Sequence, residues 1–137
     1  MKTRIFTLIM SLFIATMAFA YDAKIDGIYY NFDETNKIAE VTYRDEDYND
    51  YSGDVVIPNT VSYNGVKYSV TSIGDETFLY CSSLTPITIP NSVTSIEGDA
   101  FAFCSSLTSV QWNAKKCSDF DVDYSSPFYY CEQITSF

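Results

Sequence analysis

The chain has 137 residues and a formal net charge of −10, from 18 acidic and 8 basic side chains. Its length suits one modest domain, and its acidic surface disfavours binding to nucleic acid or to anionic lipid headgroups. It contains no histidine, and so lacks the most common general base and metal ligand, which disfavours an enzyme.

Residues 1–20 have the composition of a secretory signal peptide. Lys2 and Arg4 precede an almost wholly apolar run, and residues 18–20 (Ala-Phe-Ala) form a small-x-small cleavage site. The run is too short and wrongly flanked for a stable membrane span. No cysteine adjoins the cleavage site, so we expect an exported product that begins at Tyr21 and carries no lipid anchor.

The segment that follows is predicted to form short antiparallel strands. Asp26-Gly27 lies between apolar residues and is a tight-turn signal, which either closes a small hairpin or kinks a single strand. Residues 38–43 alternate between apolar and polar, as in a half-buried strand. We expect this strand to pair with residues 28–32 across a polar turn.

A degenerate first repeat comes next. Residues 57–61 read IPNTV and match residues 89–93, which read IPNSV. The insertion that follows the first of these contains Asn64-Gly65, the strongest short hairpin signal. We therefore predict that residues 21–69 form a β-hairpin N-terminal cap, which includes the degenerate repeat and hides the first apolar edge.

The stretch 70–112 contains two near-identical units. The second follows the first at an offset of 23 residues, so that Phe78 corresponds to Phe101 and Cys81 to Cys104. A period in this range is typical of a stacked-repeat solenoid. Each unit is also predicted to contain one helical or 3₁₀ turn, whose Phe-x-x-Cys spacing points both side chains inward. The predicted strands of these units are 70–73, 84–89, 93–96 and 107–112.

A third, stretched unit follows. Phe128 and Cys131 repeat the Phe-x-x-Cys spacing, and the added residues fall within 113–127. The repeat domain is thus predicted over 70–137, with its last repeat incomplete at Phe137. A bare last rung exposes an unpaired apolar edge, so we expect further repeats, a covering partner or self-association through this edge.

The pattern IPNSVTSIxxxAFxxCSSLTSI over residues 55–137 resembles the BspA-like leucine-rich repeats of bacterial surface proteins. The departures are Thr77, Pro86 and Glu97, which stand where the pattern has Ala, Ser and Gly. The resemblance implies a mostly β leucine-rich-repeat solenoid, a right-handed superhelix with short helical or 3₁₀ turns behind a β-hairpin N-terminal cap. It also implies a bacterial protein, secreted or displayed on the cell surface, that adheres to extracellular or host-surface proteins.

Cysteines recur at an inward-facing repeat position. Cys81, Cys104 and Cys131 share this position, and Cys117 lies in the insertion. Parallel side chains on stacked rungs rarely reach the torsion of about 90° that a disulfide needs. We therefore favour a ladder of buried free thiols over bridges, of which Cys117–Cys131 is the least improbable. Without histidine, neither a zinc site nor a catalytic cysteine is expected.

Two acidic segments match a calcium-binding loop only in part. Residues 45–49 and 119–123 carry Asp or Asn at alternate positions, but Asp50 and Tyr124 stand where such a loop needs glycine. We predict solvated loops, and no cofactor or metal. A thin solenoid offers no obvious pocket for paired catalytic carboxylates, so no enzymatic activity is expected.

The remaining candidates form a binding surface. Residues between the inward Leu and Ile positions of the repeat strands point outward as a polar ladder, which either binds a partner or is simply hydrated. Loop tyrosines are the stronger anchors if they are exposed, because binding hot spots favour Tyr, Trp and Arg. The candidate partner-binding residues are Thr85, Thr88, Thr108, Gln111, Thr135, Tyr48, Tyr51, Tyr124, Tyr129 and Tyr130.

These observations predict a non-enzymatic protein-binding or adhesion module. One alternative is a structural capping or spacer fragment of a longer repeat protein, without a ligand of its own. The other is carbohydrate binding through exposed tyrosines. Selective recognition is expected in the irregular loops 45–54 and 113–127 more than in the regular central units.

Overall fold

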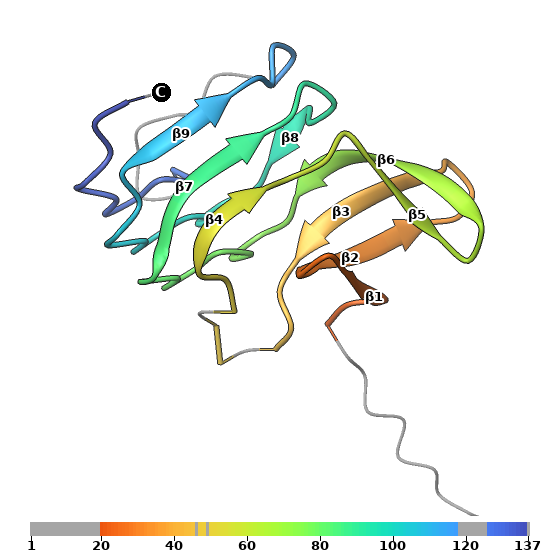
Figure 1. The fold of residues 1–137 in the computed structure, drawn as a ribbon, viewed down its shortest axis with the longest axis horizontal. Helices are drawn as coiled ribbons and strands as arrows, with labels where there is room; N and C mark the ends of the chain where they lie inside the picture. The colour runs from red at the N-terminus through yellow and green to blue at the C-terminus, as the bar shows by residue number, and fades with distance from the viewer. Residues whose placement is uncertain (1–19, 46, 49, 118–125, 137) are drawn as a thin grey trace, which may run out of the picture.

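The computed structural model describes residues 20–45, 47–48, 50–117 and 126–136, and within these ranges the chain forms strands and turns but no α-helix (Figure 1). One sheet has the order β1-β2-β3-β6-β5 with β8 beside β6, and the other has the order β4-β7-β9. The strands are β1 Ala23–Ile25, β2 Ile28–Asp33, β3 Ile38–Thr42, β4 Gly53–Val56, β5 Thr60–Tyr63, β6 Val66–Ile73, β7 Leu84–Ile89, β8 Ser95–Ile96 and β9 Ser109–Trp112. Among the described residues, no helix is long and apolar enough to span a membrane.

Some predicted features lie outside these ranges. They are the signal peptide up to residue 19, the acidic segment 119–123, Tyr124 and Phe137. In the other acidic segment, Arg44 Nε lies 2.6 Å from Asp45 Oδ2, and the Arg44 amide donates to Asp50 Oδ2 at 2.8 Å. The Asp45 carboxylate therefore pairs with the Arg44 guanidinium, and the Asp50 carboxylate accepts from the Arg44 backbone amide.

Two hairpins with left-handed turns build the N-terminal part. β1 and β2 are antiparallel and join through Asp26 and Gly27, whose φ angles are 49° and 85°. The Asp-Gly signal thus closes a hairpin, because positive φ at both central residues matches the twist of the paired strands. β5 and β6 join in the same way through Asn64 and Gly65, at 49° and 76°, which confirms the predicted inserted hairpin.

Strand β6 connects the hairpins to the repeats. The predicted pairing of residues 28–32 with 38–43 is confirmed by the antiparallel β2 and β3, and β3 then pairs with β6 in parallel. β6 also pairs with β5 and, near its end, with β8 of the next unit, where Ile73 lies beside Ile96. The boundary predicted between cap and repeats, after residue 69, therefore falls inside one continuous strand.

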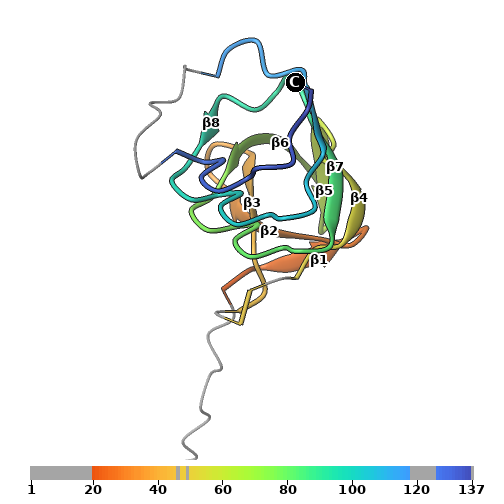
Figure 2. The same cartoon turned by 90° about the vertical axis from the view of Figure 1, so that its left-hand side faces the viewer.

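The strands β4, β7 and β9 form a parallel sheet, with one strand from each successive unit. Val55 lies beside Ile87, and Ile87 lies beside Val110, so one inward position recurs in every rung. The Ile57 amide donates to the Thr88 carbonyl at 3.1 Å, which places the degenerate first repeat in the same stack. Figure 2 shows this sheet on one side of the molecule and β3, β6 and β8 on the other, with the turns between them.

Aromatic rings and thiols fill the core between the two sheets. The rings of Phe78, Phe101 and Phe128 stack with successive centroids 4.8 and 4.9 Å apart, and Cys81 and Cys104 are fully buried in the same core. The inward Phe-x-x-Cys position is confirmed, but tight turns take the place of the predicted helical or 3₁₀ turn. The residue before each cysteine has a positive φ, a conformation that a right-handed helix does not accept.

Candidate functional site

The outer face of the β4-β7-β9 sheet presents side chains in register. Along β7, Ile87 and Ile89 are buried, while Thr88 between them is partly exposed. Val56 and Gln111 lie on either side of Thr88 in the neighbouring strands, and the Thr88 hydroxyl donates to Gln111 Oε1 at 3.2 Å. A row of outward side chains thus crosses three rungs and leaves 62% of Val56 exposed.

A second row on this sheet consists of three threonines. The Thr108 amide donates to the Thr85 carbonyl at 3.2 Å, and the Thr135 amide donates to the Thr108 carbonyl at 3.0 Å. Thr85 is partly exposed, and the other two are exposed. The sheet therefore brings the five predicted strand residues together. We call this set the strand face, and its members are Thr85, Thr88, Thr108, Gln111 and Thr135.

A shallow depression of about 460 Å³ adjoins the strand face at the carboxyl ends of the strands. Val56 and Thr88 line it from the sheet, and Asn91, Asn113 and Lys115 line it from the following loops. The last three side chains are exposed. Their amide and ammonium groups donate hydrogen bonds, and the amide oxygens accept them, so the depression presents both donors and acceptors.

Tyr51 does not belong to any exposed surface. The prediction that it is a loop anchor is wrong, because only 3% of the residue is exposed. Its ring packs against Phe78 with centroids 4.5 Å apart. Its hydroxyl donates to the Thr42 carbonyl and accepts a hydrogen bond from the Tyr29 amide at 3.1 Å. Tyr51 therefore joins a loop to the core of the first sheet.

Three other candidate tyrosines lie away from the strand face: Tyr48 lies in the loop between β3 and β4, and Tyr129 and Tyr130 lie at the turn of the last described repeat. The Tyr48 hydroxyl donates to Glu76 Oε2 at 2.6 Å. The rings of Tyr129 and Tyr130 meet edge to face with centroids 4.4 Å apart. The predicted site residues thus divide between two different surfaces.

A row of exposed aromatic rings runs along these turns. The rings of Tyr80 and Phe103 are 4.9 Å apart with planes at 20°, and those of Phe103 and Tyr130 are 5.1 Å apart with planes at 11°. We call these three residues the aromatic ridge. Tyr80 and Phe103 were not among the predicted site residues, although an aromatic side chain directly before the repeat cysteine is a visible signal.

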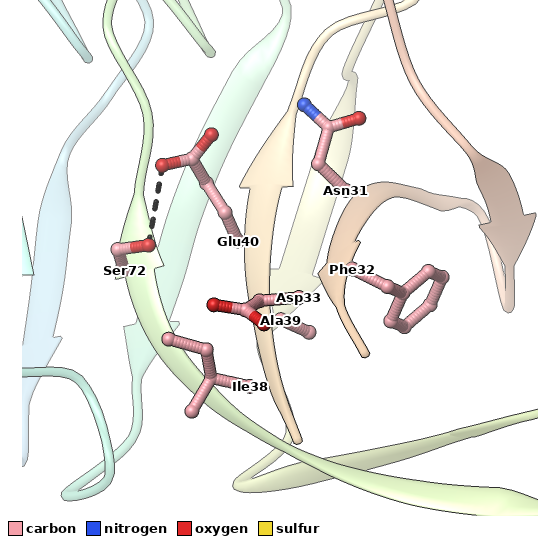
Figure 3. Close-up of a pocket in the computed structure, with 7 residues that line it drawn as sticks. All are labelled: Asn31, Phe32, Asp33, Ile38, Ala39, Glu40 and Ser72. Carbon is pink, nitrogen blue, oxygen red and sulfur yellow. Dashed lines mark hydrogen bonds between the residues drawn. The ribbon is translucent and has the colours of Figure 1, made fainter. Parts of the chain in front are cut away.

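A pocket of about 280 Å³ lies between β2, β3 and β6 (Figure 3). Glu40 points toward Ser72, whose hydroxyl donates to Glu40 Oε2 at 3.2 Å. Burial, and then the Glu97 carboxylate, raises the pKa of Glu40. Hydrogen bonds from the amide and side chain of Asn36 lower the pKa of Asp33, which also lines the pocket. Asp33 accepts these hydrogen bonds within its own turn, so Glu40 is the one carboxyl group of the pocket without such a role. Glycoside hydrolysis uses a pair of carboxyl groups.

All four cysteines lie in the described part of the chain, and none of them is joined in a disulfide. Cys81 and Cys104 are buried, as predicted for the inward ladder, and Cys117 and Cys131 are partly buried. The Cys104 thiol donates to the Phe78 carbonyl at 3.0 Å, and the Cys131 thiol together with burial raises the pKa of Cys104. Within the part of the chain that the structure describes, no three His, Cys, Asp or Glu side chains gather into a metal site.

Comparison with known proteins agrees with this geometry. A model of the BspA type leucine rich repeat region matches residues 59–137 in six copies, and no curated protein matches. A leucine-rich repeat protein from Bacteroides ovatus is 37% identical, with a TM-score of 0.61, and the match covers 72% of this chain and 25% of that one. A leucine rich cell surface protein from Faecalibacterium prausnitzii is 23% identical, with a TM-score of 0.63, over 84% of this chain and 29% of that one. A leucine-rich repeat protein from Bacteroides capillosus is 21% identical, with a TM-score of 0.62, over 84% of this chain and 97% of that one.

Proposed function

The chain belongs to the BspA-type leucine-rich-repeat family, and on that premise we propose that it is an exported, surface-displayed module that binds an extracellular or host-surface protein. We propose that it acts by adhesion and has no enzymatic activity. The signal-like N-terminal sequence and the similarity to a leucine rich cell surface protein support this location. The chain spans about a quarter of that protein's length and of the Bacteroides ovatus protein's length. The activities of those longer proteins are therefore not assigned to this chain.

The observation that carries the proposal is the in-register strand face. Thr88 and Gln111 occupy equivalent positions on neighbouring parallel strands, and Val56 extends their row. Stacked repeats use such regular surfaces to contact extended partners. The adjoining depression adds the amides of Asn91 and Asn113 to the same surface. A protein segment laid across the rungs would therefore meet hydroxyl, amide and apolar groups at each step.

The ring geometry favours a protein partner over a carbohydrate. A sugar packs its C–H groups against an open aromatic face, whereas Phe103, the middle ring of the aromatic ridge, stacks on Tyr80 at 4.9 Å and on Tyr130 at 5.1 Å, which covers both of its faces. The acidic composition likewise disfavours nucleic acid.

The proposal is tested by binding to a panel of purified extracellular-matrix proteins immobilised on a sensor surface. The double variant Thr88→Arg, Gln111→Arg places two long charged side chains on the strand face. We expect it to weaken binding by at least about tenfold, as loss of a central contact does. Ser62→Arg, at an exposed position of β5 in the other sheet, is the matched control and should bind as the parent does. Equal affinities for the parent and the double variant would falsify the assignment to this face.

A further inference from the structure

The aromatic ridge leaves large apolar surface in contact with solvent. Tyr80, Phe103 and Tyr130 are 52%, 36% and 53% exposed, although their rings stack on one another. Tyr48 extends the row at one end, with its ring 6.5 Å from that of Tyr80. Exposed apolar patches of this kind mark interaction sites on soluble proteins. The ridge lies at the turns, away from the strand face.

The backbone of the ridge is held in a conformation that aromatic residues avoid. The φ angles of Tyr80, Phe103 and Tyr130 are 56°, 58° and 54°. Glycine or asparagine suits this left-handed region, and bulky side chains do not. The same disfavoured placement occurs in three successive rungs, and in each it directs a ring outward. Strained positions of this kind cluster at functional sites.

Acidic residues lie in the same turn segments as the ridge residues Tyr80 and Phe103. Burial raises the pKa of Asp75, and the neighbouring charges of Glu76, Asp99 and Glu97 raise it further, so these four groups share one electrostatic neighbourhood. The Tyr48 hydroxyl donates to Glu76 Oε2 at 2.6 Å, which joins this cluster directly to the end of the aromatic row.

The charge of the two turn segments that carry Tyr80 and Phe103 is of one sign. Glu76 and Asp99 each lie four residues before a ridge ring, and the turn segments 74–83 and 97–106 contain no lysine or arginine. Concentrated charge of one sign next to low-dielectric surface attracts oppositely charged partners and raises their association rate. The region is therefore complementary to a cation that also carries apolar surface.

We infer that the aromatic ridge and the carboxylates of its turn segments form a docking surface for a cationic polypeptide segment rich in arginine or lysine. Stacking covers both faces of Phe103, so a cation does not sit over this ring. Instead the methylene stem of a basic side chain lies along the ring edges while its head group reaches the carboxylates. Arginine fits best, because its planar guanidinium forms two parallel hydrogen bonds to one carboxylate.

The aromatic ridge is a different surface from the strand face, and docking on it does not depend on the proposed function. Variants of the strand face leave the ridge intact, and variants of the ridge leave the strand face intact. Failure of one assignment is therefore distinguishable from failure of the other in the same set of proteins.

The test uses short fluorescent peptides of alternating arginine and serine, and a glutamate-for-arginine version as the control probe. Fluorescence anisotropy should show salt-dependent binding of the arginine peptide and none of the glutamate peptide. The variant Tyr80→Asn, Phe103→Asn, Tyr130→Asn keeps the charge and suits the left-handed backbone. We expect this triple variant to bind the arginine peptide about tenfold more weakly than the parent does. The double variant Tyr80→Phe, Tyr130→Phe keeps the rings and should bind as the parent does. Unchanged affinity after removal of the three rings overturns the inference, because charge alone would then explain binding.

A second measurement on the parent protein does not depend on the folding of any variant. Tyrosine nitration followed by mass analysis reports which rings are covered. We expect the arginine peptide to protect Tyr80 and Tyr130, each more than half exposed when free. Equal nitration of both residues with and without the peptide contradicts docking on the ridge.

Discussion

Phe101 lies flat between the rings of two neighbouring rungs. Its centroid is 4.8 Å from that of Phe78, with planes at 5°, and 4.9 Å from that of Phe128, with planes at 6°. It is fully buried. Since each rung contacts mainly its neighbours, this ring couples the first clear repeat to the last described turn.

Replacing Phe101 with alanine should therefore lower the free energy of unfolding by about 3–5 kcal/mol, because the cavity opens on both faces of the ring. Phe103→Ala, two residues away and on the surface, is the matched control and should cost about 1 kcal/mol. Urea unfolding followed by circular dichroism gives both values. Similar losses from the two variants would show that the stack is not the main link between rungs.

Tyr51→Phe should destabilise the protein by about 1–3 kcal/mol, although it removes only one oxygen. The change leaves the buried Tyr29 amide and the Thr42 carbonyl without this partner. Tyr80→Phe removes an exposed hydroxyl and should change stability by less than about 0.5 kcal/mol. If both variants unfold at the same urea concentration, the Tyr51 hydroxyl is not holding the loop.

Stability should fall in alkaline solution through two buried phenols. Burial raises the pKa of Tyr30 from 10.0 to about 12, and burial also raises the pKa of Tyr51. The unfolded chain ionises these groups near pH 10 while the folded chain keeps them protonated. Their contribution is complete below pH 10 and is lost as pH rises toward the folded-state pKa.

The expected slope is about 1.4 kcal/mol per pH unit for each tyrosine above pH 10. Urea unfolding over a pH series measures it, and Tyr30→Phe should reduce the slope. A slope that stays the same in the double variant Tyr30→Phe, Tyr51→Phe would trace the alkaline loss to other groups.

Gly65→Ala should cost about 1 kcal/mol, entirely through the backbone. The φ of Gly65 is 76°, and no atom lies within 4 Å of an added Cβ, so left-handed strain is the sole penalty. Gly65→Asn should cost less, because asparagine tolerates this region. Thermal unfolding of the two variants gives the order. A larger loss for asparagine than for alanine would contradict the strain explanation.

Local signals were sufficient to predict much of the fold. Asp26-Gly27 and Asn64-Gly65 each need positive φ at both residues, and each closes the hairpin that this requirement favours. The repeat period placed Phe101 in the core and the strand face outside, because alternate residues of a strand point to opposite sides.

Long-range partners were not predictable in the same way. Tyr51 lies in a segment without apolar periodicity, yet its hydroxyl accepts a bond from Tyr29, 22 residues away. The burial of an equivalent repeat position was not predictable either, because Trp112 occupies the position of the buried Ile89 but is only partly buried, and its Nε1 donates to the Ala114 carbonyl, two residues away, at 3.2 Å. No pattern in the residues around Tyr51 or Trp112 in the sequence indicates either arrangement.

The aromatic ridge was not predicted from the sequence, for a different reason. Aromatic residues are disfavoured at positive φ, so the segments before Cys81 and Cys104 favoured a helical turn with the Phe-x-x-Cys pair as its important face. Stacking between rungs, at 4.9 Å for Tyr80 and Phe103, offsets that local preference. Aromatic pairs contribute about 0.5–1.5 kcal/mol beyond their buried area, comparable with the local penalty.

The sharing of β6 among three partner strands has a consequence for how the molecule comes apart. Its residues pair with β5, β3 and β8, so opening the hairpins also breaks the first rung. A solenoid can in principle unravel one repeat at a time, but here the repeats cannot peel away from the N-terminal side independently. The hairpins and the first repeats should melt as one cooperative unit, and the amide hydrogens of β6 should be among the last to exchange with solvent.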